Sequence, residues 1–392
     1  MVRRWLLAGA LGAVVLGIGP GADAQETGAA DPCARLAGAT PAVAGEVGEP
    51  ALVEVSGLAA SRVHDGVLWA HNDSGDQPRV FALEEDGAPL GVYAVEGAEN
   101  VDWEDVAVGP GSDGSSALYL GDIGQNGGFR DPVTVYRVPE PDAAPDGTGG
   151  TLAGAEALEL TYPSGSVDAE ALLVDPVTGD LIVVTKVIEG TSTILRAAAD
   201  DLVPGAPITM EEAGTVTVTD PGPVDGATFP GTLVTGADIS PDGSVVVLRT
   251  YKEVLVHARP EGASVAEALA GEPCAVPVPG EPQGEAVAVT GAGDALVTIS
   301  ELGPTPAGDP LPVHRIALAP AEEDATTTTS APVAASPAED DAAPVTTDDD
   351  GDRTPIAVGA VVVLVLLAAG GVLVLRRRRR SQGRPEPGTS RP

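Results

Sequence analysis

The side chains best suited to chemistry are acidic, and they recur at one position of five related segments. These segments read SGLAAS (56–61), WEDVAVGP (103–110), AEALLVDP (169–176), GADISPDG (236–243) and GEAVAVTG (284–291). Each one begins with small or acidic residues, continues with an apolar run and ends in a turn containing Pro, Gly or Ser. Alignment on the apolar residues places five side chains in one column: Ser56, Glu104, Glu170, Ala237 and Glu285.

A second column comes from the strand expected to follow each segment. If the two strands are antiparallel neighbours, the start of the first lies beside the end of the second, so both columns meet at one end of the fold. The second column contains Asp73, Asp122, Lys186, Arg249 and Glu301. Lys186 and Arg249 could neutralise the glutamates or hold an anionic ligand such as a phosphate.

Three glutamates of the first column, Glu104, Glu170 and Glu285, would point at one axis from three different units. Carboxylates that converge on one point repel one another unless they share a cation or a proton. Outside the cell, Ca²⁺ suits oxygen ligands of irregular geometry. The sequence therefore predicts a calcium-supported ligand site formed by these glutamates. The alternative is that the acids cap turns and face solvent, as most Asp and Glu side chains do.

Catalysis at the same end is the competing hypothesis, with the protein as an extracellular phosphoester or carboxyl-ester hydrolase. The candidate catalytic residues are His71 and Asp73, acting on water or on Ser56. The sequence contains neither an HExxH motif nor a GxSxG motif, which disfavours a zinc hydrolase and an α/β-hydrolase. Polar residues flanking the two columns are His71, Asn72, Asp102, Asp105, Asp168 and Asp238.

Short β-strands must position these residues. Residues 45–319 lack long helical periodicity and alternate β-rich runs with Gly, Pro and Asp turns. A second and a third strand follow each segment, and four units add a fourth; a spare strand, ALVEV (51–55), precedes the first unit. This pattern predicts an all-β fold, a five-bladed β-propeller closed by its N-terminal strand. The alternatives are a sixth blade hidden in the long loops 141–153 and 199–213, or a β-sandwich.

Several of these segments resemble a family of secreted β-propellers common in actinobacteria. The resemblance rests on SGLAAS…LWAHNDSGD, DWEDVAVGP…LYLGDIGQN…VTVYRVPEP and DAEALLVDP…LIVVTK, and it covers most of residues 50–320. The family is loosely similar to phytase-like and esterase-like propellers. The phytase group is usually six-bladed, binds calcium and hydrolyses phosphoesters, which is what the resemblance implies about activity; the five units counted in this chain depart from that number.

Cys33 and Cys274 are the only two cysteines. In a secreted chain two cysteines favour a disulfide over free thiols. Cys274 falls in the fourth strand of the fourth unit, and Cys33 precedes the predicted ring-closing strand. A bond between them is therefore predicted to pin the N-terminal segment across the seam of the ring.

The two ends of the chain predict secretion and membrane anchoring. Arg3 and Arg4, an apolar stretch and Ala22-Asp23-Ala24 are typical of a signal peptide. An apolar run of about 20 residues spans a bilayer, and the arginines that follow it stay in the cytoplasm. The predicted boundaries are a signal peptide (1–24), an N-terminal segment (25–44), the propeller (45–319), a disordered Pro-, Thr- and Asp-rich stalk (320–354), a transmembrane helix (355–375) and a basic cytoplasmic tail (376–392).

The overall charge of the 392-residue chain excludes one class of partner. Its formal net charge is −37, and the only basic run lies at residues 376–380. Nucleic-acid binding needs basic surface, so it is not expected. We predict a single-pass protein of the plasma membrane of a high-GC Gram-positive bacterium, with its ectodomain outside. Its predicted function is to bind or scaffold an extracellular ligand or protein, and the ligand is unknown.

Overall fold

The computed structural model describes residues 31–36, 38–126, 128–301 and 311–319. These residues all belong to the first of two compact units, Met1–Thr326. The predicted signal peptide, stalk, transmembrane helix and basic tail lie outside the described residues. Within the described part of the chain, no helix has the length and apolar character needed to cross a membrane.

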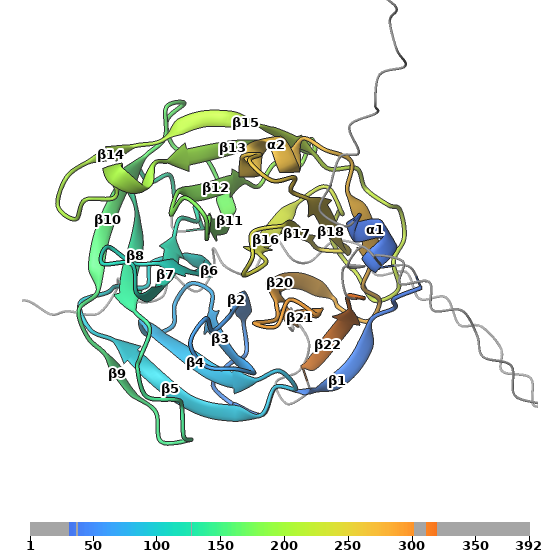
Figure 1. The fold of residues 1–392 in the computed structure, drawn as a ribbon, viewed down its shortest axis with the longest axis horizontal. Helices are drawn as coiled ribbons and strands as arrows, with labels where there is room; N and C mark the ends of the chain where they lie inside the picture. The colour runs from blue at the N-terminus through green and yellow to red at the C-terminus, as the bar shows by residue number, and fades with distance from the viewer. Residues whose placement is uncertain (1–30, 37, 127, 302–310, 320–392) are drawn as a thin grey trace, which may run out of the picture. The chain divides into compact units, whose positions relative to one another are not determined.

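Five sheets surround a common axis, and the four antiparallel strands in each of them form one blade of a propeller (Figure 1). Blade 1 contains β2 (Val55–Ala60), β3 (Val67–Asn72), β4 (Arg79–Glu84) and β5 (Pro89–Val95). Blade 2 contains β6 (Trp103–Pro110), β7 (Ser116–Asp122), β8 (Val133–Pro139) and β10 (Glu156–Thr161). Blade 3 contains β11 (Ala169–Val174), β12 (Leu181–Thr185), β13 (Thr191–Ala197) and β15 (Glu211–Thr217).

Blade 4 contains β16 (Val234–Ile239), β17 (Val245–Thr250), β18 (Glu253–Ala258) and β19 (Cys274–Pro277). Blade 5 contains β20 (Gln283–Val289), β21 (Ala295–Glu301), β22 (Pro312–Ala317) and β1 (Ala42–Glu46). The five innermost strands, β2, β6, β11, β16 and β20, begin at the same end of the ring. The predicted all-β fold with five blades is confirmed.

The hydrophobic core lies between the blades, which explains why the second strands are apolar throughout. Successive side chains of a strand point to opposite faces of its sheet. On β17, Val246 and Leu248 pack between blades 3 and 4, whereas Val245 and Val247 pack between blades 4 and 5. A strand with a neighbouring blade on each side therefore needs apolar residues at every position, unlike a strand with one face in water.

The N-terminal strand closes the ring, although it is not the strand that the sequence indicated. β1 pairs antiparallel with β22 of the last blade, so the closing strand is 42–46 and not the predicted 51–55. Residues 51–54 form a turn, and the side chain of Asn72 forms hydrogen bonds with the backbone of this turn. This side chain accepts from Val53 N at 2.9 Å and from Glu54 N at 3.0 Å, and donates to Ala51 O at 2.8 Å.

The long loops add strands to existing blades, and the described residues form no sixth blade. β9 (Gly150–Leu152) pairs in parallel with β5 of blade 1, and β14 (Ile208–Thr209) pairs in parallel with β10 of blade 2. The loop of blade 2 that contains β9 therefore extends to blade 1, and the loop of blade 3 that contains β14 extends to blade 2. Leu152 and Ile208 are buried in the cores between blades, so both additions are stabilised by apolar packing as well as by hydrogen bonds.

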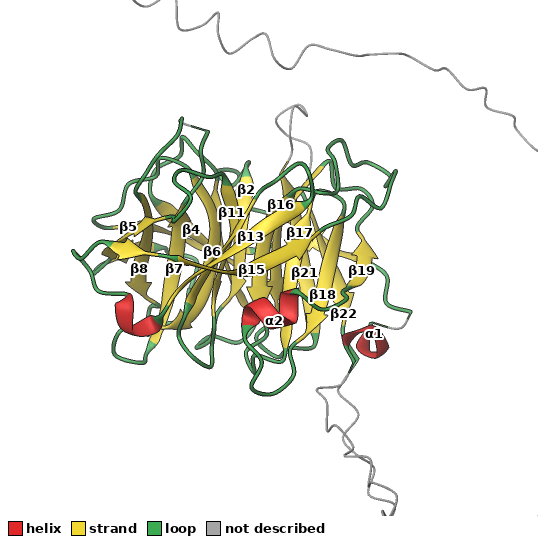
Figure 2. Cartoon of the chain, turned by 90° about the horizontal axis from the view of Figure 1, so that it is seen from above, coloured by secondary structure: helices red, strands yellow, loops and turns green. Residues whose placement is uncertain are grey.

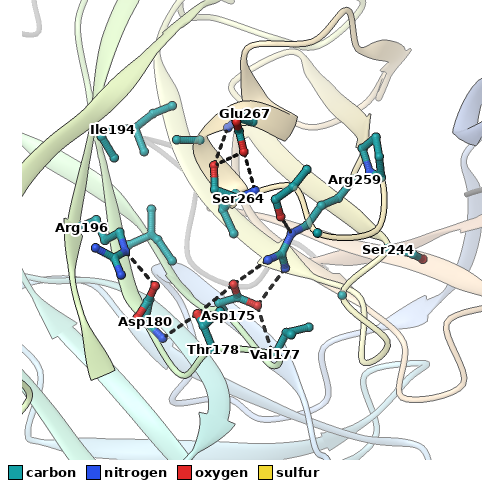
Figure 3. A pocket seen from close by; sticks show the side chains of 18 of the residues that line it. Asp175, Val177, Thr178, Asp180, Ile194, Arg196, Ser244, Arg259, Ser264 and Glu267 are labelled. Atoms are coloured by element: carbon teal, nitrogen blue, oxygen red, sulfur yellow. Dashed lines mark hydrogen bonds and ion pairs between the residues drawn. The ribbon is translucent and has the colours of Figure 1, made fainter. Parts of the chain in front are cut away.

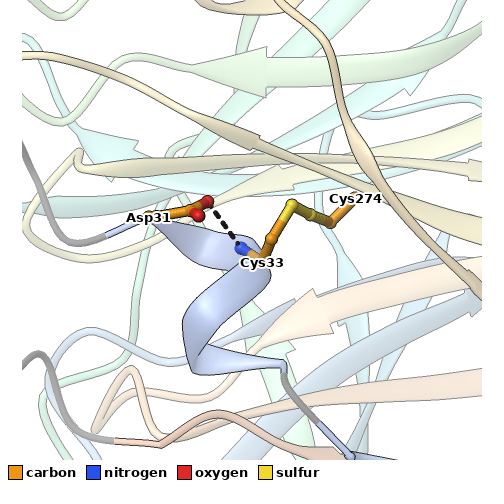
Figure 4. Close-up of a disulfide and its surroundings, with 3 residues drawn as sticks. All are labelled: Asp31, Cys33 and Cys274. Atoms are coloured by element: carbon orange, nitrogen blue, oxygen red, sulfur yellow. Dashed lines mark hydrogen bonds between the residues drawn. A yellow bond between two sulfur atoms is a disulfide. The ribbon is translucent and has the colours of Figure 1, made fainter.

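The predicted disulfide between Cys33 and Cys274 is confirmed (Figure 4). It joins the short helix α1 (Pro32–Arg35) to β19 of blade 4. Arg35 also donates to Ala319 O of blade 5 at 2.8 Å, so the N-terminal segment bridges these two blades. The bond spans 241 residues of sequence, and in the chain-entropy model it contributes about 5–6 kcal/mol.

The helices of the described residues lie away from the start of the innermost strands (Figure 2). The helix α2 (Val265–Leu269) lies in the connection between β18 and β19. Ser264 caps its N-terminus by accepting a hydrogen bond from Glu267 N, while the Glu267 carboxylate accepts from Ser264 N, which forms a capping box. α1 and α2 both lie toward the lower side of Figure 2.

Candidate functional site

The innermost strands begin around a small acidic cavity, which we call the mouth. Its volume is about 180 Å³. It is lined by Ser56, Asp73, Glu104, Asn126, Glu170, Lys186, Tyr251, Gln283, Glu285 and Glu301. Seven of the residues predicted from the two columns of the sequence are therefore brought together at this end of the ring.

Every innermost strand has a β-bulge at its start, and in four of the five blades the bulged side chain lines the mouth. In each blade the register with the second strand shifts at this point, for example between Val55 and Gly57 and between Trp103 and Asp105. A bulge leaves one residue unpaired and redirects its side chain. The bulged residues are Ser56, Glu104, Glu170, Thr235 and Glu285.

The alignment of blade 4 was wrong by two residues. Thr235, and not the predicted Ala237, occupies the bulge, and Tyr251, and not Arg249, lines the mouth. The two strands of blade 4 run antiparallel, so a shift away from the mouth raises the residue number on β16 and lowers it on β17. A single shift of two residues therefore explains both errors, 237 for 235 and 249 for 251.

One side of the mouth, formed by blades 1 and 2, gathers three carboxylates that we call the acid triad. Each of Asp73, Asp102 and Glu104 offers an oxygen, and these three atoms lie within 4.8 Å of one another. Asp102 is fully buried and Glu104 is 3% exposed. Asp102 Oδ1 and Glu104 Oε1 are buried and have no hydrogen-bond partner among the described residues.

The electrostatics of the acid triad favour neutralisation. Burial, together with the charges of Glu170, Asp73 and Asp102, raises the pKa of Glu104 well above its usual range. Burial also raises the pKa of Asp102 and of Asp73. The backbone of Gly124 packs against the Glu104 and Asp102 carboxylates so closely that a Cβ there would collide with them. The chain thus holds three acids together without a basic side chain between them.

The opposite side of the mouth, formed by blades 3 to 5, contains its own cation. Lys186 forms an ion pair with Glu170 and donates to the Tyr251 hydroxyl at 2.8 Å. Burial works against the charge of Lys186, but Glu170 and Glu285 raise its pKa and keep it protonated. Burial still raises the pKa of Glu170 to about 7 despite this lysine. We call Glu170, Lys186, Tyr251, Glu285 and Glu301 the lysine cluster.

Two carboxylates of the lysine cluster do not contact Lys186. Glu285 Oε2 is buried without a partner in the described structure, and burial with the nearby charge of Glu170 raises the Glu285 pKa well above its usual range. Glu301 hydrogen-bonds to Gln283, and burial raises its pKa to about 7. Of the predicted calcium ligands, Glu104 belongs to the acid triad, whereas Glu170 and Glu285 belong to the lysine cluster.

Two other predicted mouth residues are held in internal ion pairs. Asp122 Oδ1 lies 2.7 Å from Arg130 Nη1 and accepts from Asp102 N at 2.9 Å, so it shapes the acid triad from outside the mouth. Arg249 is fully buried and pairs with Glu281, a residue that the sequence did not single out. Neither residue is available to an anionic ligand, which corrects the predicted role of Arg249.

His71 lies in the core and does not line the mouth. Its ring packs edge-on against Trp103 with 5.5 Å between centroids, and its Nδ1 lies 3.0 Å from Asn72 O. Burial lowers its pKa to about 4, so it is neutral at physiological pH. Ser56 donates its hydroxyl to Glu104 O at 2.6 Å. The predicted pairing of His71 with Asp73 or Ser56 for catalysis is therefore not what this geometry favours.

Asp105 sits beneath the mouth and ties three blades together. Its carboxylate accepts backbone hydrogen bonds from Leu172 N at 2.9 Å and Ala237 N at 3.1 Å, in blades 3 and 4. Asp238 does similar work for blade 5 by accepting from Val289 N at 2.7 Å. Asp105 and Asp238 therefore have a structural role, because their hydrogen bonds join neighbouring blades. Three further residues line the mouth but belong to neither column of the sequence: Asn126, Tyr251 and Gln283.

The fold and the mouth together define a five-bladed β-propeller with an acidic central cavity. No protein-family model and no curated protein matches the sequence. Among solved structures, the RRP9 WD40 repeats match at 12% identity over 68% of this chain and 94% of that chain, with a TM-score of 0.34. Kuenenia stuttgartiensis hydrazine synthase matches at 12% identity over 68% of this chain and 96% of that chain, with a TM-score of 0.36. A nidogen/laminin complex matches at 13% identity over 63% of this chain and 72% of that chain, with a TM-score of 0.35.

Proposed function

We propose that this protein is a cell-surface binding or scaffold module whose mouth binds a divalent cation, Ca²⁺ in the extracellular medium, through the acid triad. The bound ion would present its open coordination positions to an extracellular ligand or protein partner. A C-terminal apolar segment would anchor the module in the plasma membrane.

The observation that carries the proposal is the pair of buried carboxylate oxygens without a partner, Asp102 Oδ1 and Glu104 Oε1, beside a third carboxylate. A buried charge with no partner is strongly unfavourable, and a cation removes this penalty for all three acids at once. An all-oxygen ligand set suits Ca²⁺, which takes six to eight oxygens in flexible geometry. Water and the ligand would complete that number.

The proposal of membrane anchoring rests on the sequence. Residues 356–375 are uninterrupted apolar residues, and five arginines follow them directly. Their length matches the hydrocarbon core of a bilayer, and the arginines favour a cytoplasmic C-terminus. In such an arrangement the residues 320–354 would hold the propeller away from the membrane surface.

The test is denaturant unfolding of the full-length protein, purified in mild detergent and stripped of metal, with and without Ca²⁺. A ligand that binds only the folded state at 100 times its Kd stabilises by about 2.7 kcal/mol. We expect a shift of that size with Ca²⁺ and a smaller one with Mg²⁺, which demands stricter octahedral geometry. With the Kd of about 10⁻⁴–10⁻³ M that is typical of extracellular calcium sites, this test needs about 10–100 mM Ca²⁺, and an unfolding curve unchanged at that concentration would refute the cation site.

A further inference from the structure

A second groove lies far from the mouth, between blades 3 and 4. Its volume is about 850 Å³. One wall is formed by the β11–β12 turn and by β13 and β15, and the other by the connection that leads from β18 into α2 (Figure 3). This connection leaves the ring at the end opposite the mouth, so a ligand here would be independent of the proposed cation site.

The outer strand beside this groove, β15, differs from the outer strands of blades 1 and 2. β5 and β10 each carry a short parallel strand on their outer edge, β9 and β14. Across the described residues, β15 carries no such strand and forms the edge of its sheet. Residues 211–215 of β15 are all exposed. An uncovered edge presents backbone N–H and C=O groups that can pair with another extended segment.

The chain itself shows what such an edge accepts. β9 and β14 are extended segments of two or three residues that hydrogen-bond to an outer strand and insert one apolar side chain between blades. Those side chains, Leu152 and Ile208, are 5% and 3% exposed. The groove beside β15 offers a comparable apolar floor, made by Ile194, Val265 and Ala266.

The rim of the groove is acidic, and its two arginines are already neutralised. Arg259 makes a two-point contact with Asp175 at 2.8 and 2.7 Å. Arg196 contacts Asp180 at 2.7 Å and Glu211 at 2.6 Å. Three further carboxylates line the groove without a basic partner among the described residues: Asp242, Glu261 and Glu267. The rim therefore attracts positive charge and repels negative charge.

We propose that β15 and the groove beside it form a docking site for an extended polypeptide segment of a partner protein, in which basic residues alternate with apolar ones. The segment adds a strand to the free edge of β15, places its apolar side chains over Ile194 and Ala266, and directs its basic side chains to the rim. A second copy of this chain docked through its own β15 does not fit, because that strand carries Glu211 and Glu212 and no basic residue to meet the acidic rim.

The test uses a fluorescein-labelled peptide of about twelve residues that alternates Lys with Val, and a companion with Glu in place of Lys. Fluorescence anisotropy with the full-length protein measures both affinities. Ala213→Arg fills and charges the groove, since Ala213 is exposed on β15 and lines it. Ala157→Arg is the matched control, because Ala157 is exposed on β10, the outer strand of blade 2, and gives the same net charge.

We expect the Lys peptide to bind at least about tenfold more tightly than the Glu peptide, a difference of about 1.4 kcal/mol. Ala213→Arg should weaken binding of the Lys peptide by about tenfold or more, and Ala157→Arg should leave it within about twofold. Amide hydrogen exchange of residues 211–217 should slow in the complex, as strand addition requires.

Three results would overturn the docking site. They are absence of binding, equal loss of affinity in the two arginine variants, and binding without protection of β15. Loss of peptide binding in Glu104→Gln with normal binding in Ala213→Arg would also overturn it, because the peptide would then occupy the mouth. The calcium experiment is unaffected by any of these results, so the two proposals stand or fall separately.

Discussion

The two sides of the mouth solve the same electrostatic problem in different ways. Both place a buried glutamate at a β-bulge, Glu104 in blade 2 and Glu170 in blade 3. The lysine cluster supplies its own counter-charge through Lys186, whereas the acid triad contains three carboxylates and no basic side chain. Glu170 therefore has a counter-charge within the folded chain, whereas the acid triad needs a proton or an added cation. This difference is the reason to locate binding at blades 1 and 2.

Removing the internal cation should have the largest effect. Lys186→Met leaves Glu170 and Glu285 buried without a counter-charge, and breaking such a buried pair typically destabilises by about 3–5 kcal/mol. The chain's other lysine is the control: Lys252→Met removes a more exposed pair with Asp220, and its expected effect is about 0–1 kcal/mol. Urea unfolding at neutral pH measures both, and equal effects would show that Lys186 is not special.

The pH dependence should be smaller and should separate the two sides. A carboxyl whose folded pKa is raised binds more protons in the folded state, so stability falls as pH rises from its unfolded to its folded pKa. Glu170 has a pKa of about 7, so it should remove about 3 kcal/mol of stability between roughly pH 4.5 and 7. Ca²⁺ should flatten the part of this slope that comes from the acid triad and leave the part from Glu170.

Unfolding curves between pH 4 and 8, with and without Ca²⁺, measure this slope. Glu301→Gln removes one further carboxyl with a pKa of about 7 and should make the metal-free slope shallower. An unfolding free energy that rises steadily from pH 4 to 8 would mean that the mouth carboxyls are solvated and that their pKa values are not raised.

The smallest expected effect concerns the glycine that holds the acid triad. A Cβ at Gly124 would collide with the Glu104 and Asp102 carboxylates, so Gly124→Ala should push them apart. We expect a loss of about 1–3 kcal/mol in unfolding free energy and at least about tenfold weaker Ca²⁺ binding. Gly150→Ala on β9, where a Cβ meets only ordinary contacts, is the control. Unchanged Ca²⁺ affinity in Gly124→Ala would show that these two carboxylates do not hold the ion.

Much of this arrangement could be predicted from the sequence because the blades repeat. The lead segments with Glu104, Glu170 and Glu285 share an apolar run that ends four residues after the glutamate, so their alignment places the glutamates correctly at the bulges. Blade 4 lacks an acid at this position. With Thr235 in place of a glutamate, the alignment slipped by two residues and gave Arg249 a mouth position that belongs to Tyr251.

Other features depended on contacts that no repeat reveals. The segment 51–55 has the composition of a strand, but Asn72 and Glu49 accept hydrogen bonds from its backbone and hold residues 51–54 in a turn. The true closing strand, 42–46, is short, rich in small residues and largely exposed, so it carries little pattern. Asp102 joins the acid triad through a loop rather than through the repeated strand, and for this reason the glutamate column did not include it.

The most direct test of the central claim is calorimetric titration of Ca²⁺ into two matched variants of the full-length protein. Glu104→Gln and Glu285→Gln change the same residue type at the same bulge in different blades. We expect one Ca²⁺ per chain in the wild type and in Glu285→Gln, with a Kd of about 10⁻⁴–10⁻³ M, and at least about tenfold weaker binding in Glu104→Gln. Undiminished binding in Glu104→Gln, or its loss only in Glu285→Gln, would show that the acid triad does not hold the ion.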